Sequence, residues 1–461
     1  MPVPAPDSPR PSRFDRLIMS NILEWGLQPE RDGLPEFTPP PPGARFPAEE
    51  MSLYWSGDRK IVVNRHPTDE MHIADFSAIL GYESVLCQAS PAEQPGYSIC
   101  TDLASDERAL AQLVEQLDDS PTDGPVTVEA FGATPEYARL VASIRQRSKR
   151  PVIDLMTQEE NLGFTSSLDS KVQAREYFQA AQPQCAALRL TRALTLRNGP
   201  DLLNQVKDAL KTLGPVIVKT EFGAGGNAMA IIERTRGLRK TLSRILPAGY
   251  GGELLVEEFL GSGKKALSVS YNGTVQDDGK TFTLSAGRHF LYADKFFLGS
   301  CLGIGSVPDD CATKIRSAGE AVGQVSASFG YRGPLNIDFI YRESDGALFP
   351  LEINPRRALG GTLADMCISL FGQGYEKAVS AVAHHSVPVH QDITTYAELR
   401  DCLLRKGWFG KETKGLVVLP YMVTTLAPKS VIGLVVLGTD GTSGEEALGE
   451  ITGYLSGRHR K

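Results

Sequence analysis

Three oxygen-bearing side chains lie in two neighbouring apolar stretches of the chain. Asp338 lies within NIDFIY, and Glu352 and Asn354 lie within LEINPRR. Both stretches predict strands, and the short segment between them predicts a hairpin in which the three side chains converge. Mg²⁺ takes oxygen ligands and usually binds through one or two carboxylates together with the phosphates of a nucleotide. The hairpin therefore predicts a site for a Mg-nucleotide, and Arg356 adds a guanidinium fork for phosphate.

The alternative is that Asp338 and Glu352 are solvated carboxylates of an ordinary surface hairpin. Acidic residues lie mostly at surfaces, and strands often alternate apolar with polar positions. However, each of the two acids is flanked on both sides by large apolar residues, which places both strands on a core. Two acids, an amide and an arginine within one short unit favour the binding site over the surface hairpin.

A glycine-rich turn follows a buried strand that ends in a lysine. The sequence PVIVK ends at Lys219, and Gly223, Gly225 and Gly226 precede the apolar run AMAII. Glycines let the backbone approach a ligand closely, so amide hydrogens could cover phosphate oxygens while Lys219 meets the α and β phosphates. The alternative is a hairpin whose glycines serve only its turn, which a lone glycine cluster would favour.

Two further segments carry candidate nucleotide contacts. Lys171 would lie in the first turn of a helix that Asp169 or Ser170 caps, near free amide hydrogens that attract anions. The run ELLVEEFL predicts a buried strand, and its last backbone groups, from Glu258 to Leu260, could bond an adenine edge. The Gly-Lys-Lys that follows is not a P-loop, because the first glycine and the serine or threonine of that motif are both missing.

Charged residues in SAGRHFLYADKFFLGSCLG are a further set of candidates. Most charges on loops are simply solvated, and that alternative stays open here. Phosphoryl transfer, however, depends on positioning and on cations around the equatorial oxygens more than on a protein nucleophile. Arg288 and Lys295 are therefore the candidates for stabilising the transferred charge. His384 and His385 have no partner at metal-ligand spacing and are expected to be structural.

The first third of the chain must supply an α/β unit beside these residues. Residues 1–48 are rich in proline, which predicts a loosely held arm with one short helix around residues 14–25. Between residues 49 and 167, short apolar runs such as KIVVN and PVTVEA alternate with helical stretches. That alternation predicts an open α/β sheet.

The remainder predicts a strand-rich middle and a second small α/β unit. Strands are expected from 215 to 271, a loop-rich stretch from 288 to 305, and a helix from 313 to 329, before the acidic hairpin. After residue 375, a helix, two apolar strands and a terminal helix predict a separate C-terminal domain spanning 376–461. The fold class is therefore α/β, with α+β character in the middle.

Composition bounds the class of protein. A chain of 461 residues predicts two to four domains, and a net charge of −7 gives no basic surface for nucleic acid. Seven scattered cysteines without a C-x-x-C pair fit a reducing cytoplasm rather than a zinc ribbon or disulfides. No apolar run is long enough for a membrane span, and no signal peptide is expected at the start. The sequence leaves open whether the protein is a monomer or a homodimer.

Four motifs in this order and spacing, VIVKTEFGAGGNAMAII, ELLVEEFL, YRGPLNIDF and LEINPRR, resemble the ATP-grasp enzymes. The resemblance covers residues 168–375, and residues 49–167 stand where those enzymes carry a pre-ATP-grasp α/β domain. It implies an ATP-grasp fold, with ATP and Mg²⁺ as cofactors. The roles that it implies are phosphate contacts for Lys171 and Lys219, an adenine hinge at Glu257, Glu258, Phe259 and Leu260, Mg²⁺ ligands at Asp338, Glu352 and Asn354, and an acyl-phosphate contact for Arg356.

One departure concerns the ribose. Many ATP-grasp enzymes place a glutamate a few residues after the hinge to bind the ribose hydroxyls, whereas this chain has Lys264 and Lys265 there. The resemblance therefore implies that ribose recognition comes from another residue.

The C-terminal sequence GLVVLPYMVTTLAPKSVIGLVVLGTD narrows the resemblance to ATP-grasp peptide ligases of antibiotic biosynthesis. It implies that ATP activates a guanidinoacetic acid with a substituted phenyl group, through an acyl phosphate, for attack by the amino terminus of a peptide. ADP and phosphate would be released, and Arg288 would stabilise the tetrahedral oxyanion. Two alternatives stay open: a phosphotransferase that acts on a small molecule, and a nucleotide-binding regulatory module without turnover.

Overall fold

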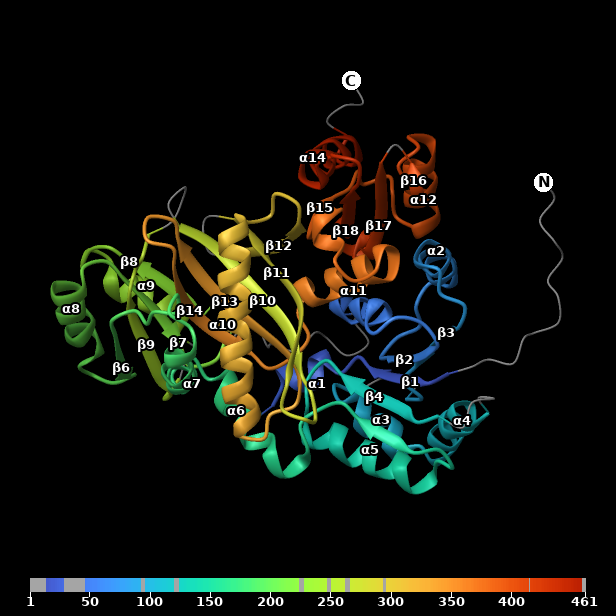
Figure 1. The fold of residues 1–461 in the computed structure, drawn as a ribbon, viewed down its shortest axis with the longest axis horizontal. Coiled ribbons are helices and arrows are strands. Elements are labelled where there is room, and N and C mark those ends of the chain that lie inside the picture. Colours follow the sequence, from blue (N-terminus) through green and yellow to red (C-terminus); the bar gives the residue numbers. More distant parts are fainter. Residues whose placement is uncertain are drawn as a thin grey trace.

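The computed structural model describes residues 14–28, 46–92, 96–119, 124–223, 228–246, 250–261, 266–292, 296–413 and 415–457. Its strands form a five-stranded, a four-stranded and a nine-stranded sheet, with helices packed around them (Figure 1). No helix within these ranges is both long enough and apolar enough to cross a membrane. The seven cysteines are all described, and all are free thiols.

The five-stranded sheet is parallel, with the strand order β3-β2-β1-β4-β5. Its strands are β1 (Arg16–Met19), β2 (Lys60–Asn64), β3 (Val85–Ala89), β4 (Val126–Ala130) and β5 (Val152–Asp154). Its helices are α2 (Glu70–Leu80), α3 (Ile99–Ser105), α4 (Glu107–Asp118) and α5 (Pro135–Arg147). The open α/β unit predicted from the alternating pattern is thus present.

The segment predicted as a loosely held arm contributes the middle strand of this sheet. β1 pairs with β2 on one side and β4 on the other, and Leu17, Ile18 and Met19 are fully buried. The prediction was wrong for residues 14–28 because the prolines end before the apolar run that forms β1. A short helix, α1 (Ile22–Gly26), follows directly after the strand. The prolines at 1–13 and 29–45 lie outside the described residues.

The four-stranded sheet is antiparallel and forms a separate lobe at the left of Figure 1. Its strands are β6 (Ala193–Arg197), β9 (Glu253–Glu258), β7 (Val216–Thr220) and β8 (Met229–Ile232), in that order across the sheet. Helices α8 (Leu202–Leu213) and α9 (Leu238–Ile245) pack on it and close its core. The strands predicted from PVIVK, AMAII and ELLVEEFL are confirmed.

The nine-stranded sheet is antiparallel, with the order β14-β13-β10-β11-β12-β15-β18-β17-β16. Its strands are β10 (Ala266–Val275), β11 (Thr281–Tyr292), β12 (Phe296–Gly303), β13 (Gly333–Arg342), β14 (Ala347–Asn354), β15 (Ser380–Pro388), β16 (Gly410–Thr413), β17 (Leu416–Met422) and β18 (Val431–Gly438). Its helices include α10 (Asp309–Ser328), α11 (Leu359–Phe371), α12 (Tyr396–Arg405) and α14 (Gly444–Leu455). The strands after residue 375 extend the same sheet, and the division into 1–48, 49–167, 168–375 and 376–461 stays a prediction.

Most of the described residues in the loop-rich stretch expected between 288 and 305 are instead strand: they form the end of β11 and all of β12. Glycines caused the error, since they usually mark loops. Here they permit close approach of neighbouring strands: a Cβ at Gly287 would lie 2.3 Å from the carbonyl oxygen of Cys301, and one at Gly299 would lie 2.0 Å from that of Ala383. Glycine inside a strand often marks such an approach.

Lys60 is a buried cation in the core beside the parallel sheet. Its side chain has no exposed surface, and its Nζ donates to the carbonyl oxygen of Trp55 at 2.7 Å. Burial lowers the pKa of Lys60 to about 7, although the nearby Asp365 and Glu129 carboxylates oppose that change. Below about pH 7 the folded protein therefore carries a positive charge at a buried site that destabilises the charged form.

Replacing Lys60 with methionine should stabilise the protein most below pH 7. An unfolded lysine keeps its proton up to about pH 10.4, so between pH 7 and 10 the unfolded state binds more protons and the wild-type stability rises with pH. Each pKa unit is worth about 1.4 kcal/mol, so the free energy of unfolding of the wild type should rise by a few kcal/mol between pH 7 and 10. Urea denaturation at pH 6.5 and 9.5 should show the gain from Lys60→Met shrinking at the higher pH. A gain independent of pH would contradict the buried charge.

Candidate active site

A cavity of about 710 Å³ lies between the four-stranded and nine-stranded sheets and extends to α1 and β17. Most of the predicted site residues line it, and their strands come from both sheets. The residues concerned are Lys171, Lys219, Gly223, Glu257, Glu258, Phe259, Leu260, Asp338, Glu352, Asn354 and Arg356. The structure thus brings together segments that are almost two hundred residues apart in the sequence.

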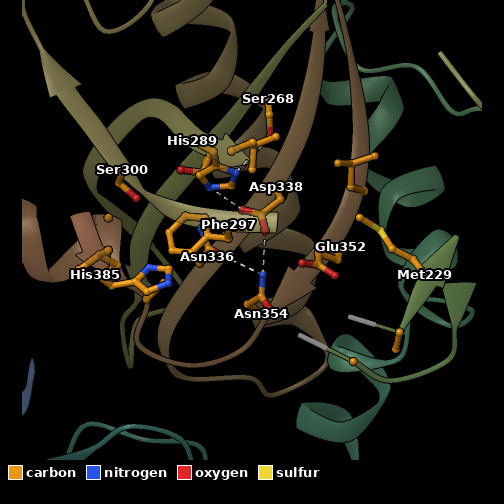
Figure 2. A pocket seen from close by; sticks show the side chains of 18 of the residues that line it. Met229, Ser268, His289, Phe297, Ser300, Asn336, Asp338, Glu352, Asn354 and His385 are labelled. Atoms are coloured by element: carbon orange, nitrogen blue, oxygen red, sulfur yellow. Dashed lines mark hydrogen bonds and ion pairs between the residues drawn. The ribbon is translucent and has the colours of Figure 1, made fainter. Parts of the chain in front are cut away.

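The acidic hairpin forms the floor of this cavity. β13 and β14 pair so that Asp338 lies opposite Glu352 and Asn336 lies opposite Asn354, which confirms the predicted hairpin. Figure 2 shows the Asn354 amide bonded to both Asn336 and Asp338. Its Nδ2 lies 2.8 Å from Asn336 Oδ1 and 3.3 Å from Asp338 Oδ2. The three predicted metal ligands therefore share one face of the hairpin.

The electrostatics of the floor favour a bound cation. Burial and the negative charge of Glu352 raise the pKa of Asp338 well above its usual range. Burial also acts to raise the pKa of Glu352, but the ammonium groups of Lys171 and Lys219 outweigh it and lower that pKa to about 2. Asp338 Oδ1 is buried and accepts no hydrogen bond from any described residue, and His289 Nε2 lies 3.4 Å from it. A cation would relieve the repulsion between the two acids.

The donor set fits Mg²⁺ rather than a closed metal cage. Within the described ranges, no group of three or more His, Cys, Asp and Glu side chains is placed to hold a metal ion. The hairpin supplies two carboxylates, whereas the Asn354 oxygen accepts from Arg356, and Mg²⁺ commonly binds through one or two carboxylates together with phosphates and water. The residues present therefore fit Mg²⁺ bound with a nucleotide.

Two lysines approach the floor from the opposite side. Lys171 lies in the turn between α6 (Leu162–Asp169) and α7 (Ala174–Ala181), not in the first turn of a helix as predicted. Its Nζ is 3.0 Å from Glu352 Oε2 and donates to the carbonyl oxygen of Gly223 at 2.7 Å. Lys219 Nζ lies 2.8 Å from Glu257 Oε2. Both ammonium groups are thus fixed by carboxylates while they line the cavity.

The predicted hinge lies at the end of β9, beside the apolar part of the cavity formed by Ile217, Ile340 and Leu351. The amides of Glu258 and Phe259 already donate to the carbonyl oxygens of Arg192 and Pro215, at 3.0 and 2.8 Å. A ligand cannot use these two amides without breaking the sheet. The residues predicted as the hinge line the cavity, and their contact with adenine stays a prediction.

Arg288 does not belong to this site. Successive side chains of a strand point to opposite faces, and Arg288 lies on the face of β11 away from the cavity. Its Nη2 pairs with Glu445 Oε1 of α14 at 2.6 Å. The structure therefore does not bring Arg288 together with the other site candidates, and its predicted role in catalysis stays a prediction. Its neighbour His289 occupies the cavity face instead.

Some predicted residues lie outside the described part of the chain. These are Gly225, Gly226 and Lys295, together with Lys264 and Lys265. Their predicted roles therefore stay predictions. Gly223 is described and has φ 150°, a backbone conformation that favours glycine.

Sequence reasoning missed a row of rings on the floor. His289, Phe297 and His385 line the cavity from β11, β12 and β15 (Figure 2). Phe297 lies edge-on to His289 at 5.1 Å between ring centroids and stacks on His385 at 5.7 Å. Burial lowers the pKa of His289 to about 4, so its ring is neutral at pH 7. Alternation along a correctly assigned strand would have identified His289.

Arg356 joins the acidic floor to aromatic residues of the N-terminal unit. Its Nη2 donates to Asn354 Oδ1 at 2.8 Å. Its guanidinium carbon lies 5.0 Å from a ring centroid of Trp25 and 5.5 Å from that of Phe131. Neither aromatic residue was predicted from the sequence, and Trp25 falls within the stretch predicted as a loosely held arm.

Comparison with known proteins identifies the fold of this chain. No family model matches the chain. A curated relative, the arginine-specific large chain of carbamoyl phosphate synthase from Lactiplantibacillus plantarum, is 23% identical over 196 residues. That match spans 42% of this chain but 18% of the relative.

Several solved structures are similar along nearly the whole chain. An ADP complex of N5-carboxyaminoimidazole ribonucleotide synthetase superimposes with a TM-score of 0.54 at 12% identity, covering 98% of both chains. Biotin carboxylase from Campylobacter jejuni gives 0.55 at 13% identity, covering 93% of this chain and 88% of that one. The N5-carboxyaminoimidazole ribonucleotide synthetase of Thermus thermophilus gives 0.52 at 14% identity, covering 96% and 98%. These likenesses confirm the predicted ATP-grasp fold.

Proposed function

We propose that this chain is an ATP-dependent carboxylate–amine ligase that forms ADP and phosphate. The observation that carries the proposal is the pairing of Asp338 with Glu352 on one hairpin, opposite Lys171 and Lys219 in the same cavity. Such an array suits a metal-bound triphosphate, because it combines carboxylates for the cation with ammonium groups for the phosphates. Two of the structures named above support a nucleotide site, since the N5-carboxyaminoimidazole ribonucleotide synthetase was solved with ADP and the biotin carboxylase as a β,γ-ATP complex.

Each of the site residues has a role in the proposed reaction. Asp338, Glu352 and Asn354 would hold Mg²⁺, which lowers the negative charge that an attacking carboxylate meets. Lys171 and Lys219 hold the phosphates, and the end of β9 holds adenine. Arg356 lies next to Asn354 and fixes the substrate carboxylate beside the γ-phosphate. Holding the reacting groups in line supplies much of the rate in phosphoryl transfer.

The chemistry then proceeds in two steps. A carboxylate oxygen attacks the γ-phosphorus, the bond to the bridging oxygen of ADP breaks, and an acyl phosphate forms. An uncharged amine attacks the acyl carbon, phosphate leaves with the bonding electrons, and the amine proton is lost to solvent or phosphate. Neither step requires a covalent enzyme nucleophile.

The finer proposal concerns the substrates. The C-terminal motif resembles the peptide ligase of pheganomycin biosynthesis, so we propose a phenyl-substituted guanidinoacetic acid as the acid and a peptide amino terminus as the amine. Several residues of that motif line the cavity, among them Tyr421 and Met422, and they support a role for β17 in substrate binding. No nucleic acid or membrane partner is proposed.

Hydroxylamine trapping tests the proposed function. With ATP, Mg²⁺ and a pool of carboxylic acids, a ligase should release ADP and convert the activated acid into a hydroxamate that mass spectrometry detects. A stable phosphorylated product without hydroxamate would instead establish the phosphotransferase. Nucleotide binding without any ADP release would establish the regulatory module.

A further inference from the structure

The cavity has an apolar chamber at the end formed by α1, β4 and β17. Its wall comprises Ile22, Leu23, Trp25, Met51, Phe131 and Met422. Ile22, Trp25, Phe131 and Met422 belong to the hydrophobic cluster that joins the parallel sheet to the nine-stranded sheet, and Met51 packs against that cluster. The walls at the other end, such as Ile217 and Met229, come from the four-stranded lobe, which has its own core. The chamber is therefore distinct from the part assigned to ATP.

Charge differs between the two ends of the cavity. The acidic residues that line its described part are Glu257, Glu258, Asp338 and Glu352, and they all lie on β9, β13 and β14. Lys171 and Lys219 pair with acids at that end, whereas the boundary with the chamber carries the guanidinium of Arg356 against Trp25 and Phe131. A ligand that fills the chamber should therefore place an apolar group, such as a phenyl ring, against this wall and a negative group at the inner end.

The chamber holds Arg356 in place. Trp25 and Phe131 meet edge to face at 5.7 Å between ring centroids, and both lie within 5.5 Å of the guanidinium carbon. A guanidinium over aromatic faces is attracted by their electron-rich surfaces. The same guanidinium bonds Asn354, so its direction is fixed at the boundary between chamber and floor.

Trp25 is itself fixed by its surroundings. Gly132 is required beside it, because a Cβ there would lie 2.2 Å from Trp25 Cδ1. The preceding residue, Glu24, is buried and accepts hydrogen bonds from Ser98 Oγ at 2.8 Å and from the amide of Cys100 at 3.1 Å. These contacts tie α1 to the body of the N-terminal unit. Trp25 is therefore a rigid wall rather than a mobile side chain.

Building on the proposed ligase, we infer that the chamber binds the body of the carboxylic acid substrate and selects acids with an aromatic or long aliphatic group. Arg356 meets the carboxylate at the inner end, and Trp25 is a positioning residue that aims Arg356. An acid such as acetate or bicarbonate leaves the chamber unfilled and gains no apolar contact from it. The specificity therefore resides in the wall, not in the acidic floor.

Two methionines at opposite ends of one cavity provide a matched test. We would measure kcat/KM for phenylacetate, hexanoate, acetate and bicarbonate by hydroxamate formation with ATP and Mg²⁺. The wild type should prefer phenylacetate and hexanoate over acetate by at least about tenfold. Met422→Ala should lower that preference about tenfold without raising the KM for ATP, whereas Met229→Ala should raise the KM for ATP and keep the preference.

Binding gives a readout that needs no turnover. The ¹⁹F NMR signal of 4-fluorophenylacetate, recorded with ADP and Mg²⁺, should broaden in the wild type and in Met229→Ala, and this broadening should weaken in Met422→Ala. Trp25→Leu should raise the KM for the acid, and Trp25→Phe should restore part of the loss because it returns an aromatic face. Thermal melting of each variant shows whether it is folded.

The outcomes separate the two proposals. Equal use of acetate and phenylacetate, or a preference unchanged in Met422→Ala, would overturn the chamber while leaving the ligase in place. If ADP binds but no acid yields hydroxamate, the ligase fails, and the ¹⁹F signal alone decides the chamber: broadening that Met422→Ala removes supports it, and an unchanged signal overturns it.

Discussion

Glu352→Gln should lower acid-dependent ADP release by about a thousandfold, which corresponds to about 4 kcal/mol at the rule of tenfold per 1.36 kcal/mol. A bound metal ion contributes several kcal/mol to the stabilisation of transferred charge. Glu352 is also the carboxylate that pairs with Lys171 at 3.0 Å, so its loss weakens one metal ligand and frees one phosphate contact. Release of ADP at saturating ATP and Mg²⁺ is the measurement.

The hairpin offers a matched control for this substitution. Asp345 lies in the turn between β13 and β14, pairs with Arg342, and does not line the cavity. Asp345→Asn should therefore keep full activity, whereas Asp338→Asn should behave like Glu352→Gln. Unchanged melting temperatures would assign the loss to the site rather than to the fold. Full activity in Glu352→Gln or Asp338→Asn would remove the basis of the proposed function.

Strands that are buried on one face could be predicted from the sequence, and the acidic hairpin is the best case. Asp338 and Glu352 each stand between apolar residues, so alternation alone sets both acids on the same face. The pairing of Asp338 with Glu352 then follows from a short turn, and the structure has that register. Strands β7, β8 and β9 of the lobe that carries Lys219 were equally accessible because they contain continuous apolar runs, whereas the partly exposed β6 was not predicted.

The sequence predictions were wrong where local composition suggested an arm or a loop but pairing with distant strands formed regular structure. Prolines on both sides hid β1, whose burial depends on pairing with β2 and β4 rather than on any local signal. Glycines hid β11 and β12, which moved Arg288 into a supposed loop and concealed His289. Trp25 reaches the site only through the parallel sheet, and Gly132 makes room for it. No periodicity in one segment reports such a contact, because it depends on the positions of several elements.

The joint between the parallel sheet and the rest of the molecule is a buried ion network centred on Arg357. This arginine, which follows β14, pairs with Glu129 at the end of β4 and with Asp365 of α11, the latter at 2.9 Å. Its guanidinium carbon also lies 5.6 Å from a ring centroid of Trp55. All three charged side chains are buried or nearly so. The network therefore ties Arg356, the preceding residue in the chain, to the sheet that carries Trp25.

Arg357→Met should destabilise the protein by about 3–5 kcal/mol, because it leaves two carboxylates buried without their cation. Burial alone would raise the pKa of Glu129, but the Arg357 guanidinium outweighs it and holds that pKa below its usual value. Without Arg357, the folded protein must either keep an unpaired charge or bind a proton. Urea denaturation at pH 7 measures the loss, and the deficit should shrink as the pH falls toward about 5 and the acids become protonated.

Two further variants separate the buried network from charge in general. Arg342→Met removes an arginine of β13 whose partner Asp345 is about one third exposed, as is Arg342 itself, so its effect should stay within about 1 kcal/mol. Combining Arg357→Met with Glu129→Gln and Asp365→Asn should recover part of the lost stability, because the two buried carboxylates are then no longer left without Arg357. If Arg357→Met were as mild as Arg342→Met, the network would not hold the two parts of the cavity together. Correct placement of Trp25 against Arg356 would then have to come from apolar packing alone.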